Sequence, residues 1–114
     1  MTDYLQVVTT LPSETAAREL ATAVVADRLA ACVQIEGPVT SLYRWQGEVA
    51  TATEWRLTMK LPAAGYAALE SAIQQRHPYE IPEILAIPVT AGLPAYLEWV
   101  DSSCKAPRTR TDDD

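Results

Sequence analysis

Hydrophobic and polar positions alternate along this chain with two different periods, and the switches between them predict a series of strands and helices. Residues 4–10 are rich in β-branched and apolar side chains, which is typical of a strand buried on both faces. Ser13 is a suitable N-cap for a helix over residues 14–30, where apolar residues recur at helical spacing. The many alanines of this segment would allow the helix to lie close to a sheet.

Two long extended segments follow, joined by the turn signal Gln46-Gly47. The first, residues 32–45, is interrupted at residues 36–38 (Glu-Gly-Pro), where we expect a β-bulge or a bend. In the second, successive side chains point alternately to the two faces of a strand as far as residue 61. One row of it contains Val49, Thr51, Thr53, Trp55, Leu57, Met59 and Leu61, and the opposite row contains Ala50, Ala52, Glu54, Arg56, Thr58 and Lys60. Two long strands joined by a short turn predict a β-hairpin.

The second half of the chain predicts two further helices with a short strand between them. Pro62 is a typical residue for a helix start, and apolar side chains at helical spacing continue to about Arg76. A loop with two prolines then leads to a short apolar strand at residues 84–89, and an apolar seam over residues 93–104 predicts a last helix. Residues 105–114 have almost no aliphatic side chains, so we expect a disordered tail.

The element order is therefore β-α-β-β-α-β-α, which predicts an α+β fold of the ferredoxin-like class, βαββαβ plus a C-terminal helix, in a single domain over residues 1–104. Right-handed crossovers place both main helices on one face of an antiparallel sheet and leave the other face uncovered. A monomer of this size would expose that face and the protruding hairpin strands to water. We therefore expect self-association with cyclic symmetry, in preference to a monomer with a solvated polar face.

Composition narrows the classes of function. The chain has 114 residues and a net charge of −6, which argues against binding to nucleic acid or to an anionic membrane surface. No apolar run reaches the length of a membrane span, and the first residues lack the pattern of a secretory signal. Cys32 and Cys104 make no disulfide framework, and each has the apolar neighbours of a buried thiol. We therefore expect a cytoplasmic protein without a membrane or nucleic-acid partner.

The loop over residues 77–84 (His-Pro-Tyr-Glu-Ile-Pro-Glu-Ile) carries the most chemistry in the chain. It combines the only histidine with a phenol and two carboxylates, on a backbone stiffened by two prolines. A stiff backbone with polar side chains suits a ligand site, because less entropy is lost on binding. The alternative is a rigid connector with solvated polar groups. His77 with Glu80 and Glu83 could contact a cation, although one histidine is too few for tight binding of Cu(II) or Zn(II) within one chain.

Three segments together resemble the CutA divalent-cation-tolerance proteins. They are residues 29–32 (Leu-Ala-Ala-Cys), residues 41–47 (Ser-Leu-Tyr-Arg-Trp-Gln-Gly) and the loop over residues 77–84, while Lys60 and residues 96–99 (Tyr-Leu-Glu-Trp) also fit. The resemblance covers about residues 4–104. It implies a ferredoxin-like fold in a very stable homotrimer, similar in architecture to the PII signalling proteins. It also implies a cytoplasmic location and a link to copper or other divalent-metal tolerance, without an established catalytic activity.

In the proteins that this chain resembles, signature polar residues gather in clefts between subunits. The resemblance thus implies a ligand cleft, with His77 as the candidate metal ligand, lined by Lys60, His77, Tyr79, Glu80, Glu83 and Trp45. The chain departs from the family at Arg76, because metal-binding members can carry two adjacent histidines there, and at Thr9 or Thr10, where a cysteine can stand. Arginine has no free lone pair for a cation. We therefore expect Cu(II) or another divalent cation to bind weakly, and no other cofactor.

Two other classes of function compete with a trimeric binding protein. A PII-like sensor would bind a small ligand or nucleotide between subunits and needs a long mobile loop after the hairpin, which the Gln46-Gly47 turn does not supply. An enzyme on this fold, such as an acylphosphatase, needs an asparagine to place water, and the chain contains none. We find no catalytic constellation. We interpret Tyr43, Trp45, Trp55 and Trp99 as packing or interface anchors.

Overall fold

The computed structural model of the chain describes residues 3–105. The elements are β1 (Tyr4–Leu11), α1 (Glu14–Ala26), β2 (Cys32–Trp45), β3 (Glu48–Pro62), a 3₁₀ turn (Ala63–Gly65), α2 (Tyr66–Arg76), β4 (Leu85–Val89) and α3 (Pro94–Ser103). All four strands pair antiparallel in one sheet, in the order β2-β3-β1-β4. This is the ferredoxin-like α+β fold that the sequence predicts.

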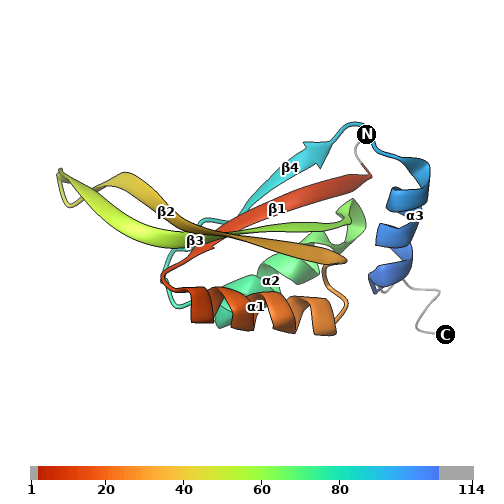
Figure 1. Ribbon diagram of the computed structural model, residues 1–114, viewed down its shortest axis with the longest axis horizontal. Helices are drawn as coiled ribbons and strands as arrows, with labels where there is room; N and C mark the ends of the chain where they lie inside the picture. Colours follow the sequence, from red (N-terminus) through yellow and green to blue (C-terminus); the bar gives the residue numbers. More distant parts are fainter. Residues whose placement is uncertain (1–2, 106–114) are drawn as a thin grey trace.

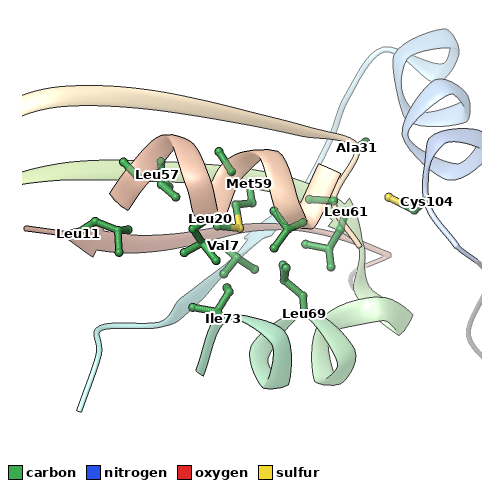
Figure 2. Close-up of a cluster of buried hydrophobic side chains, with 14 of the residues drawn as sticks. Val7, Leu11, Leu20, Ala31, Leu57, Met59, Leu61, Leu69, Ile73 and Cys104 are labelled. Atoms are coloured by element: carbon green, nitrogen blue, oxygen red, sulfur yellow. The ribbon is translucent and has the colours of Figure 1, made fainter. Parts of the chain in front are cut away.

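The two main helices cover one face of the sheet. Figure 1 shows α1 and α2 on the same side of the strands, α3 beyond one end of the sheet, and the β2–β3 hairpin projecting past the other end. The apolar row of β3 points toward the helices, and its members Leu57, Met59 and Leu61 are fully buried. They pack with Leu20 of α1 and with Leu69 and Ile73 of α2 in the cluster shown in Figure 2.

The opposite face of the sheet, called the open face below, carries the other row of each strand. One line of cross-strand neighbours runs over all four strands and consists of Ile87, Gln6, Lys60 and Cys32. The register also places Glu54 opposite Val39, so the polar row of β3 and the row of Tyr43 and Trp45 share this face. The expected irregularity in β2 is confirmed, because the register with β3 shifts between Glu36 and Val39.

Several expectations need correction. Helix α1 ends at Ala26 and not at residue 30, because Arg28 adopts a left-handed conformation with φ 59°. The Arg28 guanidinium then donates to the carbonyl oxygens of Ser102 and Ser103 at 2.9 and 3.3 Å, which ties α1 to the end of α3. Pro62 ends β3 and does not start α2. Cys32 is half-buried on the open face and not in the core, whereas Cys104 is buried as expected.

The predicted tail lies almost entirely outside the described residues. Only Lys105 belongs to them, and its backbone N–H donates to the carbonyl oxygen of Arg28 at 2.8 Å. Among the described helices, none is long and apolar enough to cross a membrane.

Candidate functional site

The loop over residues 77–84 lies beside β3 at the point where β1 ends. The last pair of the β1–β3 ladder is Leu11 with Trp55, so Glu54 is the first residue of β3 beyond the end of β1. The loop connects α2, on the helical face, to β4, which pairs with the other edge of β1. It therefore passes around the end of β1, and its side chains reach both Thr10 of β1 and Glu54 of β3.

His77 is buried and both of its ring nitrogens are occupied. Nε2 lies 2.8 Å from the carbonyl oxygen of Thr10, and Nδ1 accepts the backbone N–H of Tyr79 at 3.2 Å. A carbonyl oxygen only accepts and a backbone N–H only donates, so the proton must be on Nε2 and the lone pair on Nδ1. The imidazole is thus neutral, in a single tautomer. Burial lowers its pKa, against the opposing effects of the Thr10 carbonyl and the Glu54 carboxylate.

Tyr79 connects the loop to β3. Its hydroxyl donates to Oε2 of Glu54 at 2.8 Å, and its ring lies against the His77 ring with centroids 4.9 Å apart. Glu54 is 9% exposed, so this hydrogen bond serves a carboxylate that water reaches poorly. Burial and the bond to Glu54 together raise the pKa of Tyr79 to about 12, and the phenol keeps its proton at neutral pH.

The other predicted cleft residues lie outside the cluster of His77, Tyr79 and Glu54. Glu80 is exposed and lines an open hollow of about 330 Å³ with Glu70, Gln74 and Ile81, and Glu83 is exposed as well. Lys60 lies six positions after Glu54 on β3, or about 20 Å at ~3.3 Å per residue. Its ammonium donates to the Gln34 side chain at 2.7 Å. Trp45 is at the hairpin tip and is 62% exposed.

Within one chain, the structure therefore brings together only His77 and Tyr79 of the six predicted residues. Two partners in this group were missed from the sequence, namely Glu54 and the Thr10 carbonyl group. Glu54 carried a usable signal, because it is a carboxylate in the polar row of β3 just beyond the point where β1 stops. The sequence held no signal for the Thr10 carbonyl group, since any backbone carbonyl oxygen can accept a hydrogen bond from a histidine.

The residues present do not fit a tightly bound metal ion. No group of three or more His, Cys, Asp or Glu side chains is placed to hold a metal ion within residues 3–105. His77, the one imidazole of the chain, has no free lone pair, since the Tyr79 N–H occupies Nδ1 and the proton occupies Nε2. A metal could reach this ring only after the loop had lost a hydrogen bond. The loop is a connector fixed to the sheet, because His77 and Tyr79 are hydrogen-bonded to β1 and β3, and these two polar groups are not merely solvated as in the rigid-connector alternative.

Comparison with known proteins decides the family. Residues 5–103 match the family model described as "CutA1 divalent ion tolerance protein". The chain belongs to this family. The divalent-cation tolerance protein CutA of Thermus thermophilus is 45% identical over 94 residues, which are 82% of this chain and 91% of that protein. The mouse "Protein CutA" is 42% identical over 91 residues, and this chain spans 51% of its length.

Solved structures of family members agree with the fold. The crystal structure of CutA1 from Oryza sativa has a TM-score of 0.91 at 33% identity, covering 93% of this chain and 97% of that chain. The divalent cation tolerance protein from Thermus thermophilus has a TM-score of 0.87 at 41% identity, covering 90% and 99%. A member from Archaeoglobus fulgidus is named as a periplasmic protein, so the location of one family member does not carry over to another.

Proposed function

We propose that this member of the divalent-cation tolerance family acts as a homotrimeric binding protein in the cytoplasm, not as an enzyme. The observation that carries the proposal is the projecting hairpin with its exposed apolar side chains. At its end, Leu42, Trp45 and Val49 are 68%, 62% and 70% exposed. Such a set of side chains on a free pair of strands is typical of a surface that a partner covers.

The sheet edges support a second copy of the chain as that partner. The outer strands of the sheet are β2 and β4, and on β4 Leu85 and Ile87 are 58% and 46% exposed. Beyond the end of β1, the hairpin strand β3 also has one unpaired edge. Apolar edge strands at both sides of one sheet suit a cyclic assembly, in which each copy covers its neighbour and clefts form between subunits.

The hydrogen bonds of His77 limit how tightly this protein would bind a cation. Because both ring nitrogens are used, we propose that Cu(II) and other divalent cations bind weakly, through carboxylates such as those of Glu80 and Glu83. A nucleotide sensor of the PII type is the alternative. The hairpin turn consists only of Gln46 and Gly47, both with positive φ, and provides no mobile loop to signal binding.

The test is sedimentation velocity at low micromolar concentration. The unaltered protein should sediment at three times the monomer mass. The double variant Tyr43→Glu/Trp45→Glu places charge on the hairpin and should sediment at a lower mass. Val25→Glu is the matched control, because Val25 is 41% exposed on α1, outside the hairpin and the sheet edges, and its mass should not change. A monomer mass for the unaltered protein would refute the proposal.

A further inference from the structure

We infer that the hairpin of one copy inserts the ring of Trp45 into an apolar pocket beside α3 of the next copy. Trp45 is the last residue of β2 and is 62% exposed. The pocket holds about 180 Å³ and lies between α3, the start of β1 and the end of β3. Because it needs a second copy, this contact rests on the proposed self-association, and it names the surfaces that meet.

The pocket suits an apolar ring. Its walls include Leu5 and Leu61 from the sheet and Leu97 and Val100 from α3, while Ala91 at its mouth is exposed. An apolar cavity of about 150 Å³ is large enough for benzene. A pocket of about 180 Å³ with an open mouth can therefore take most of an indole ring whose backbone stays outside.

The helix that forms one wall of the pocket is fixed within its own chain. Tyr4 donates its hydroxyl proton to Asp101 of α3. The Arg28 guanidinium donates to the carbonyl oxygens of Ser102 and Ser103 at the end of the same helix. Since the wall is in place before anything enters, an inserted side chain does not have to order it, and little entropy is lost.

The hairpin presents Trp45 at its tip. The turn consists of Gln46 and Gly47, both with positive φ, so Trp45 directly precedes the end of the projecting ribbon. Tyr43, two positions earlier in the same row, is 46% exposed. Tryptophan has only two side-chain torsions to fix and buries a large apolar area, which makes it a frequent anchor at protein interfaces.

The tip and the pocket lie at opposite ends of the molecule. Figure 1 shows the hairpin turn at one end of the long axis and α3 at the other. A chain therefore cannot place Trp45 in its own pocket, and the contact joins two copies. Each copy offers one tip and one pocket, so the copies join head to tail and form a ring when the rotation closes. A two-fold contact, in which a surface meets itself, does not join these two surfaces.

Charge at the two surfaces is complementary. Arg44, which directly precedes Trp45, is exposed at the tip. The hydroxyl of Tyr4, a residue of the pocket wall, is surrounded by three carboxylates, those of Asp3, Glu98 and Asp101. Within residues 3–105, neither Arg44 nor these carboxylates form an ion pair. A positive tip is thus attracted to the pocket of a neighbouring copy and guided toward it.

Thiol cross-linking of the full-length protein with a short bis-maleimide tests the contact. The variant Glu48→Cys/Ala91→Cys, with Cys32→Ala to remove the half-buried thiol, keeps Trp45 and places one thiol opposite it on the hairpin and one at the mouth of the pocket. We expect species of two and three times the monomer mass on a denaturing gel. Glu48→Cys/Ser71→Cys is the matched control, because Ser71 is exposed on α2 and outside the pocket, and it should remain at the monomer mass.

Sedimentation velocity at the same concentration separates failure of this contact from failure of the proposed function. A trimer that gives no cross-link between positions 48 and 91 would overturn the contact and leave the trimer standing. Cross-linking in Glu48→Cys alone would show that hairpin tips meet one another, and would also overturn the contact. A monomer mass for the unaltered protein would refute the proposed trimer, and the contact with it.

Discussion

Nε2 of His77 donates a hydrogen bond to the carbonyl oxygen of Thr10 at 2.8 Å, across 67 positions of the sequence. The bond fixes the loop after α2 to the end of β1, and the N–H of Tyr79 fixes the other side of the same ring. A protonated imidazole has two N–H groups and no acceptor, so it cannot keep the bond from Tyr79. The loop is therefore built for a neutral histidine.

The stability of the protein should fall on mild acidification. Burial lowers the folded-state pKa of His77 below its ordinary value of about 6.5, so the unfolded chain takes up the proton first. The contribution is thus present above about pH 6.5 and is lost as the pH falls from there toward the folded-state pKa. Urea unfolding at pH 7.5 and 5.5, at one protein concentration, measures this loss. His77→Gln should be less stable at pH 7.5 and should change less between the two pH values; parallel losses in both proteins would contradict the assignment.

The hydroxyl of Tyr79 should contribute to stability through Glu54. Tyr79→Phe leaves a carboxylate that is 9% exposed without its donor, and we expect a loss of about 1–3 kcal/mol in the free energy of unfolding. Tyr66→Phe is the matched control, because its hydroxyl also donates to a glutamate, Glu70, but at an exposed site. We expect that change to be within about 0.5 kcal/mol.

A double-mutant cycle separates this bond from other effects of the Tyr79 change. Glu54→Gln and Tyr79→Phe should be non-additive by about 0.5–3 kcal/mol, since each removes the same contact. Additive changes in denaturant unfolding would show that the two side chains act independently.

Glycine should be required at position 37, where the ring of Trp55 crosses the backbone. A Cβ atom at Gly37 would lie 2.2 Å from Cδ1 of Trp55, so the ring or the strand would have to move. We expect Gly37→Ala to reduce stability by about 1–3 kcal/mol. Gly65→Ala is the control, because its Cβ would meet only Leu61 at an ordinary 3.5 Å. Thermal unfolding compares the two, and equal midpoints would contradict the packing that the structure shows.

The sequence predicted the strands and the open face because these follow from alternation, which is local. The apolar row of β3 is buried where it was expected, and the Gln46-Gly47 turn is where it was expected. The end of α1 was misjudged, since alanines after Ala26 still favour a helix while Arg28 leaves it through a left-handed conformation. That conformation is stabilised by contacts with α3, which is distant in sequence.

The candidate site was predictable in its residue types and not in its arrangement. The loop over residues 77–84 does carry an organised polar cluster, but the partners of His77 and Tyr79 come from β1 and β3. Which carboxylate meets Tyr79 depends on where β1 ends against β3, and that register is a property of the folded sheet. Lys60 was expected to line a cleft between subunits with this loop; within one chain it lies six positions from Glu54 on β3 and outside this cluster.

The central claim is that His77 is a neutral structural residue and not a metal ligand. Since it is the only histidine in the chain, the ¹⁵N spectrum of the imidazole is free of overlap in a protein without an affinity tag. Long-range ¹H–¹⁵N correlation at pH 7.5 should show a protonated Nε2 and an unprotonated Nδ1, unchanged by one equivalent of Zn(II) per chain. A ring with both nitrogens protonated, a proton on Nδ1, or nitrogen shifts that move with one equivalent of Zn(II) would contradict the account.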